Sequence, residues 1–227
     1  MHEIVQRLIR IENQIKEEST KFNIPKVAKI IAIAKTFPLE SIIPLIEHGH
    51  LHFGENKVQE AKIKWTNIKK EKPRLNLHFV GKLQTNKAKD VVKLFDYVHS
   101  LENIKQAEVL SKYESEFKKK LKYFIQINIG YETQKSGIAS KDAKNFLEVC
   151  VNKYDLNIIG LMCLPPYDEF SEKYFMEMKN LQKSLLTSYH NQSEELSMGM
   201  SNDYTIAIQE GATLVRVGTA LFGERPQ

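Results

Sequence analysis

The chain has 227 residues, of which 42% are hydrophobic, and a formal net charge of +5. This length allows a substantial buried core, while no apolar run is long enough to predict a membrane span. The amino terminus lacks the apolar stretch of a signal peptide, and two cysteines are too few for a disulfide framework. We therefore expect a soluble, cytoplasmic protein.

The positive charge gathers in two runs, KKEKPR at 69–74 and FKKKLK at 117–122. Aromatic residues are not interleaved with these lysines, as stacking on a single-stranded nucleic acid requires. Because basic charge alone specifies no partner, we interpret both runs as solvated helix faces and expect no nucleic-acid partner.

The first predicted element is an amphipathic helix at about 2–20, since Ile4, Leu8, Ile11 and Ile15 recur at helical spacing. From residue 29 onward, short apolar runs alternate with helical patterns. The predicted strands are 29–35, 51–56, 77–81, 97–101, 122–130, 158–164, 196–200 and 214–218. The predicted helices between them include 39–48, 56–70, 85–95, 103–121, 140–154 and 171–188. Asn103, Ser140 and Ser171 are expected to cap the helices that they open.

Alternation of strands and helices predicts an α/β fold with parallel strands, because only a crossover returns the chain in the same direction. Eight such units in about 200 residues fit a closed (β/α)₈ TIM barrel. The alternative is an open doubly wound sheet, but its glycine-rich dinucleotide fingerprint is absent after the first strand. With no low-complexity linker in the sequence, we predict a single barrel domain over residues 1–227.

In such barrels, the chemistry lies where strands end and helices begin. The residues at those positions are Lys35, Glu55–Asn56, Gly81, Met200–Ser201 and Gly218–Thr219.

The turns after strands seven and eight predict a phosphate site. Ser201 is placed as the N-cap of a short helix that ends at Gly211, and Gly218 and Thr219 begin a final short helix. A helix amino terminus offers free N–H groups, and glycine lets the backbone approach an anion. Each turn alone reads as an ordinary cap, but the two together occupy the usual phosphate position of this architecture.

Barrel closure would bring Lys35 beside those turns, because strand eight then neighbours strand one. Taken alone, Lys35 reads as a strand-end lysine whose amine reaches solvent. An amine beside a phosphate site instead suggests a phosphorylated aldehyde held as a Schiff base.

Arg216 lies on the eighth strand, where it alternates with Leu214. A buried guanidinium needs a partner, which could be an ion pair inside the barrel or the ring nitrogen of a bound cofactor. Because guanidinium keeps its proton, a ring nitrogen facing it would stay unprotonated, and the ring would be a poor electron sink.

The sequence resembles the pyridoxal 5′-phosphate (PLP) homeostasis proteins, also called the YggS or proline synthase co-transcribed family. The matching stretches, in family order over about 28–223, are AIAKTFP, FGENKVQEAKIK, LHFVGKLQTNK, INIGYETQKSGI, GLMCLPP, LSMGMSNDY and VRVGTALFG.

The family is similar to the barrel half of alanine racemase, the type III fold of PLP enzymes. The resemblance implies PLP as cofactor, with Lys35 forming the Schiff base and Arg216 facing the pyridine nitrogen. It further implies a phosphate site made by Ser201, Gly218 and Thr219, with Asn56 near the ring and Met200 lining the pocket.

Two residues depart from the family pattern. Ala34 replaces the serine often found before the lysine, and Lys82 stands where the family usually has histidine. Lys82 could place a second amine near the pocket mouth, and we leave open whether PLP binds there as well.

The resemblance favours a monomeric protein that holds PLP and takes part in PLP homeostasis, without strong catalysis of its own. Racemases of this fold carry a second domain that supplies a second base, and this chain ends at Gln227, nine residues after Gly218. Apo forms of PLP enzymes are the expected acceptors. The alternatives are a small PLP-dependent amino-acid racemase, or a barrel that binds nucleic acid or protein without PLP.

Three alternating histidines, His48, His50 and His52, could share a strand face as metal ligands do. His48 and Gly49 read as the end of a helix, which breaks that alternation, so we predict no metal site. Cys163 reads as a small buried residue at a strand end.

Overall fold

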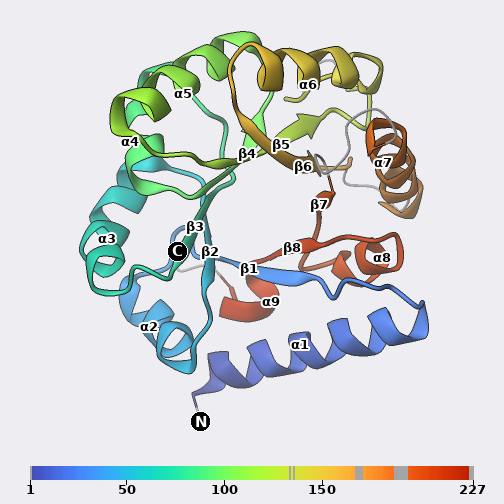
Figure 1. The fold of residues 1–227 in the computed structure, drawn as a ribbon. Coiled ribbons are helices and arrows are strands. Elements are labelled where there is room, and N and C mark those ends of the chain that lie inside the picture. Colours follow the sequence, from blue (N-terminus) through green and yellow to red (C-terminus); the bar gives the residue numbers. More distant parts are fainter. Residues whose placement is uncertain (1, 133, 135, 167–170, 187–193, 225–227) are drawn as a thin grey trace.

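Parallel strands form a ring at the centre of the molecule, with helices around it (Figure 1). The computed structural model describes residues 2–132, 134, 136–166, 171–186 and 194–224. Its strands are β1 (Lys29–Ile33), β2 (His52–Glu55), β3 (Asn76–Phe79), β4 (Tyr97–Leu101), β5 (Lys122–Ile127), β6 (Asn157–Cys163), β7 (Glu195–Met200) and β8 (Leu214–Val217). The strands pair in chain order, and β8 returns to pair with β1, which confirms the (β/α)₈ barrel and excludes the open sheet.

Helices follow the strands on the outside of the ring. They are α1 (Glu3–Lys21), α2 (Leu39–His48), α3 (Val58–Glu71), α4 (Ala88–Leu94), α5 (Ile104–Phe117), α6 (Ala143–Asn152), α7 (Ser171–Leu186), α8 (Tyr204–Gln209) and α9 (Thr219–Phe222). Short 3₁₀ turns, η1 (Thr85–Lys87) and η2 (Ser140–Asp142), precede α4 and α6. Residues 187 and 188 of the predicted seventh helix lie outside the described residues.

Several predicted boundaries shift for local reasons. The helix predicted at 103–121 ends at Phe117, because Lys118 adopts a left-handed conformation with φ of 49°. Asn103 caps that helix as predicted, its side chain accepting the Gln106 N–H. Ser140 does not cap a helix: it begins the 3₁₀ turn η2, with Ala139 in the preceding N-cap position. Ser171 is the first helical residue of α7.

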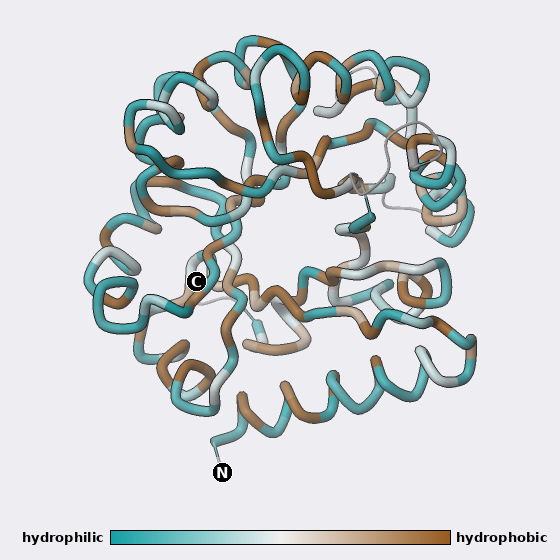
Figure 2. Tube along the Cα trace, in the orientation of Figure 1, coloured by the Kyte–Doolittle hydropathy of each residue, from teal (hydrophilic) through white to brown (hydrophobic). Residues whose placement is uncertain are grey.

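Helix α1 lies across the outside of the barrel beside β1 and α8 (Figure 1). Its predicted apolar stripe is buried, while its other face is hydrophilic (Figure 2). The buried face comprises the predicted Ile4, Leu8, Ile11 and Ile15, together with Val5. This helix therefore covers part of the barrel wall, as its amphipathic pattern indicates.

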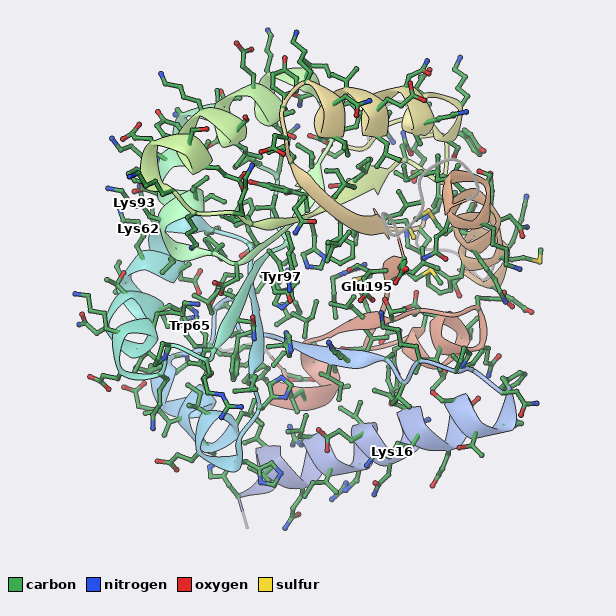
Figure 3. All side chains as sticks on the ribbon, viewed as in Figure 1. Lys16, Lys62, Trp65, Lys93, Tyr97 and Glu195 are labelled. Carbon is green, nitrogen blue, oxygen red and sulfur yellow. The ribbon has the colours of Figure 1, made fainter. Side chains whose placement is uncertain are left out.

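The core has an outer and an inner part. The outer cluster fills the space between the strands and the surrounding helices, and includes Trp65, which lies between α3 and the barrel (Figure 3). The inner cluster fills the barrel and consists of Ile31, Ile33, Tyr97, Phe124, Met162 and Leu214. The barrel is thus a packed scaffold rather than a pore.

The two basic runs are tied into the fold at several points. The Lys69 ammonium donates to the Leu75 carbonyl and to Asp96, at 2.7 and 2.6 Å. Lys119 donates to the Phe95 carbonyl at 2.7 Å, and Lys120 to the Asp155 carboxylate. Part of the positive charge therefore serves the protein's own structure.

In the part of the chain that the structure describes, no helix combines the length and the apolar character needed to cross a bilayer.

Candidate functional site

A cavity of about 550 Å³ opens at the carboxyl ends of the strands. Its lining includes every predicted site residue: Lys35, Asn56, Met200, Ser201, Arg216, Gly218 and Thr219. These residues come from β1, β2, β7 and β8 or from the turns after them, so only barrel closure brings them together. The volume lies within the range of about 300–1,000 Å³ that is typical of small-molecule sites.

The alternation of β1 carries Lys35 into this cavity. Ile31 and Ile33 belong to the inner cluster, and Lys35 is the next residue in that alternation. The strand itself ends at Ile33, shorter than predicted, because the chain turns at Thr36 with φ of 69°. Lys35 thus follows the strand by two residues, and its side chain lines the cavity because the inner face of β1 continues directly into it.

Helix α3 holds the turn that carries Lys35 from two sides. The Lys64 ammonium donates to the Ala34 carbonyl at 2.8 Å, and the Thr36 N–H donates to Glu60 at 2.7 Å. Lys64 and Glu60 also form an ion pair at 3.2 Å. Sequence reasoning missed these positioning residues, although both lie within the matching stretch FGENKVQEAKIK.

Glu55, predicted at the same strand end as Asn56, does not line the cavity. Its fully buried carboxylate faces α3, where it accepts hydrogen bonds from Lys64 at 2.8 Å and from the Trp65 indole at 2.9 Å. Burial raises the pKa of this carboxyl, and the adjacent Lys64 opposes that shift. Of the predicted acid–amide pair, only the amide reaches the site, because successive residues of a strand face opposite sides.

Asn56 offers an unused acceptor to the cavity. Its Oδ1 is buried and has no hydrogen-bond partner among the described residues. Gly81, on the neighbouring strand end, packs against the Asn56 backbone: a Cβ built on Gly81 would lie 2.0 Å from the Asn56 carbonyl oxygen. The absence of a side chain at Gly81 thus permits the position of Asn56.

The two turns predicted to bind phosphate lie side by side and are joined by Ser201. The prediction that Ser201 caps the following helix is wrong, since Asp203 holds that position in α8. The Ser201 Oγ instead accepts the N–H groups of Gly218 and Ala220, each at 3.2 Å. Tertiary proximity of the turns, rather than the local pattern, decides what this hydroxyl binds.

Thr219 is the first residue of α9, as predicted, and Gly211 follows α8 with φ of 89°. Asp203 also lines the cavity, and its Oδ1 accepts the Met200 N–H at 2.6 Å. Sequence reasoning did not anticipate Asp203 or the other lining residues: Ile33, Phe37, Val80, Leu164 and Asn202. Phe37 stacks on Phe222 of α9, with ring centroids 4.7 Å apart.

Arg216 is buried at the base of the cavity. Its Nη1 donates to the carbonyl and the hydroxyl of Ser197, both at 2.7 Å, and its Nη2 donates to the Cys163 carbonyl at 2.8 Å. Burial lowers the pKa of this guanidinium. Among the described residues, no carboxylate forms an ion pair with Arg216. The ion pair inside the barrel, one of the two partners that the sequence suggested, is therefore not observed there.

Lys82 is exposed and does not line the cavity. Cys163 is fully buried, as predicted, and burial raises the pKa of its thiol to about 12. His48 ends α2, whereas His52 lies in β2 and its ring hydrogen-bonds His78. Over the described ranges, no group of three His, Cys, Asp or Glu side chains could hold a metal ion.

Comparison with known proteins places the chain in a family. Residues 7–226 match the family model for the N-terminal domain of alanine racemase. The pyridoxal phosphate homeostasis protein of Pasteurella multocida is 37% identical over 227 residues, which cover 98% of this chain and 97% of the relative. The chain belongs to the family of pyridoxal phosphate homeostasis proteins.

Solved structures agree with membership of the pyridoxal phosphate homeostasis family. PipY of Synechococcus elongatus, solved without PLP, matches with a TM-score of 0.87 and 32% identity, over 97% of this chain and 100% of PipY. PipY has also been solved with PLP bound, where the TM-score is 0.84. Alanine racemase of Clostridium difficile shares the fold, with a TM-score of 0.74 at 15% identity, and this chain covers 57% of its length.

Proposed function

We propose that this chain binds PLP as a Schiff base on Lys35 and takes part in intracellular PLP homeostasis, without strong catalysis of its own. The observation that carries the proposal is the convergence of the Lys35 amine, the Arg216 guanidinium and the Ser201–Gly218 turns on one cavity. Membership of the family and the PLP-bound structure of PipY support it.

Each lining residue has a chemically suited role in this proposal. Ser201, Gly218 and Thr219 surround the phosphate beside the start of α9, and the hydroxyls of Ser201 and Thr219 donate to it. Arg216 faces the pyridine nitrogen with the donors that Ser197 and Cys163 leave available. The unpartnered Oδ1 of Asn56 suits a hydrogen bond from a bound ligand near the ring, and Met200 lines the cavity edge.

The cavity favours holding the cofactor over catalysis with it. PLP, when bound, supplies an electron sink that is strongest with a protonated ring nitrogen, and a guanidinium partner leaves that nitrogen unprotonated. Among the described lining residues, Asp203 is the remaining acid–base group beside Lys35 and Arg216, and its Oδ1 already accepts the Met200 N–H. A proton donor and acceptor pair on opposite faces of a substrate, which racemisation uses, has no clear source in this lining.

The decisive experiment compares Lys35→Ala with Lys82→Ala. Purified chain supplied with PLP should show the absorption band of a Schiff base, and borohydride should fix one pyridoxyl group to the protein. We expect Lys35→Ala to abolish both signals and Lys82→Ala, which alters an exposed lysine outside the cavity lining, to retain them. A pyridoxyl group that is still fixed in Lys35→Ala would assign the Schiff base to another lysine.

The carrier role has a separate test. Loaded chain mixed with the apo form of a PLP enzyme should restore that enzyme's activity, because a Schiff base exchanges with amines. Incubation with single L-amino acids, followed by chiral analysis, should show no sustained turnover. Sustained racemisation would contradict the carrier role and favour the small racemase.

A further inference from the structure

Hydrogen-bonded side chains cross the barrel interior from Arg216 to the opposite opening. The Ser197 Oγ, which accepts from Arg216 Nη1 at 2.7 Å, lies 2.9 Å from His99 Nδ1. His99 Nε2 lies 2.9 Å from His78 Nδ1, and His78 Nε2 lies 2.9 Å from His52 Nδ1. We call His52, His78 and His99 the histidine chain.

The histidine chain ends at the amino-terminal mouth of the barrel, the opening at the start of the strands. Lys29, His52, Tyr97, Lys122 and Glu195 line this mouth, and Tyr97 and Glu195 are labelled there in Figure 3. The cavity at the other end of the barrel contains Arg216. The two ends of the barrel are therefore linked through polar side chains inside an otherwise packed interior.

The guanidinium sets the direction of these hydrogen bonds. Arginine donates and never accepts, so the Ser197 hydroxyl accepts from Arg216. Among the described residues, the other partner of this buried hydroxyl is His99 Nδ1, so the Ser197 O–H donates to it. An O–H without an acceptor in this buried place would be costly.

The hydrogen bonds between the imidazole rings have the same donor-to-acceptor direction. A neutral imidazole that accepts at Nδ1 carries its proton on Nε2. His99 Nε2–H therefore donates to His78 Nδ1, and His78 Nε2–H donates to His52 Nδ1. At the end of the histidine chain, the Nε2–H of His52 is not used by another ring of that chain.

The surroundings keep these rings neutral and in place. His78 and His99 are fully buried, and burial lowers the pKa of each well below its ordinary value. Burial also lowers the pKa of His52 to about 4, aided by the nearby Lys29 and Lys122.

Two rings are further fixed by stacking. His78 stacks on Tyr97 with centroids 4.1 Å apart, and His99 stacks on Phe124 with centroids 4.2 Å apart. These contacts hold the planes of both imidazole rings against their aromatic neighbours.

We propose that His99 is a positioning residue for Arg216, acting through Ser197, and that the whole histidine chain carries its protons on Nε2. The role toward the cofactor rests on the proposed function, since it assumes that Arg216 faces bound PLP. With its Ser197 contacts fixed from behind, the guanidinium presents its remaining donors in one orientation.

The tautomers can be measured without PLP. Nitrogen-15 spectra of the imidazoles in the unloaded protein at pH 7 should show His52, His78 and His99 neutral, each protonated on Nε2. His50 is an internal standard, because its Nε2 donates to the His52 carbonyl, which can only accept. In Ser197→Ala the Nδ1 of His99 loses its donor, so its nitrogen signal should move to that of an acceptor without a hydrogen bond, while Nε2 keeps its proton. A proton on Nδ1 of His99 in the unaltered chain, or unmoved signals in Ser197→Ala, would overturn the assignment.

A pair of variants tests the positioning role. His99→Phe keeps an aromatic ring to stack on Phe124 but removes the acceptor for Ser197, whereas His99→Asn keeps an acceptor near the Nδ1 position. We expect His99→Phe to release PLP about tenfold faster and to shift the absorption band of the Schiff base, and His99→Asn to stay within about twofold of the unaltered chain.

The outcomes separate the two proposals. Unaltered PLP release and spectrum in a folded His99→Phe would remove the positioning role while leaving PLP binding intact. If instead the unaltered chain bound no PLP, the proposed function would fail, and the nitrogen-15 result would still decide the tautomers.

Discussion

At the scale of single residues, backbone contacts shape the cavity as much as side chains do. Asn56 presents an unpartnered oxygen to the cavity, and Gly81 permits this by leaving no Cβ against the Asn56 carbonyl. Gly81, the last residue of LHFVG, therefore matters for the space that it leaves to Asn56, although it has no side chain that could bind a ligand.

We expect Gly81→Ala to lower the free energy of unfolding by more than about 3 kcal/mol, because the new Cβ would meet backbone that cannot turn aside. Gly211→Ala is the matched control. Its Cβ would meet nothing within 4 Å, so only its φ of 89° is penalised, by about 1–2 kcal/mol. Urea unfolding of both variants measures the difference. Equal losses would show that the close approach at Gly81 costs nothing.

At the scale of elements, α3 positions the amine that β1 delivers. Lys64 and Glu60 hold the backbone on either side of Lys35, and Lys64 also neutralises the buried Glu55. The turn is thereby fixed by a helix that makes no other contribution to the cavity lining.

We expect Glu60→Ala to loosen this turn, because the Thr36 N–H then loses its acceptor. The Thr36 amide should exchange with deuterium at least about tenfold faster, as expected for loss of a charge-assisted hydrogen bond. Glu60→Gln keeps an oxygen acceptor and should exchange nearly as slowly as the unaltered chain. Equal protection in Glu60→Ala would mean that Glu60 does not restrain the turn.

At the scale of the whole molecule, the barrel separates the cavity at the carboxyl ends of its strands from the mouth at their amino ends, and it buries neutral histidines between them. Such histidines make stability depend on pH. Burial lowers the pKa of His50 and of His52 from 6.5 to about 4. Between these values the unfolded chain holds more protons than the folded one, so the free energy of unfolding falls as the pH drops.

We expect the stability lost between pH 6.5 and pH 4 to reach about 3 kcal/mol for each such histidine. The raised pKa of Glu55 and of Glu114 gives a smaller trend of opposite sign above their ordinary value of 4.5. Urea unfolding at a series of pH values measures the total, and His52→Gln should show a shallower decline. An unchanged slope in His52→Gln would contradict the neutral state of this ring.

Sequence periodicity determined the barrel, because alternating strands and helices leave parallel pairing as the way to bury both faces of the sheet. It also determined which strand ends meet at the cavity, since parallel strands that close in chain order must bring their carboxyl ends together and place Lys35 beside Gly218. These conclusions depend on local pattern plus one topological rule, which is why they could be reached without coordinates.

Tertiary structure alone decided the partners of the polar groups. Ser201 binds N–H groups across to the next turn instead of capping its own helix, Glu55 turns to α3, and Arg216 connects through Ser197 to the histidine chain. Histidines 52, 78 and 99 lie far apart in the sequence, on three neighbouring strands, and each gives no local signal. Hydrogen bonds depend on distances of a few ångströms between segments, and only the packed barrel fixes those distances.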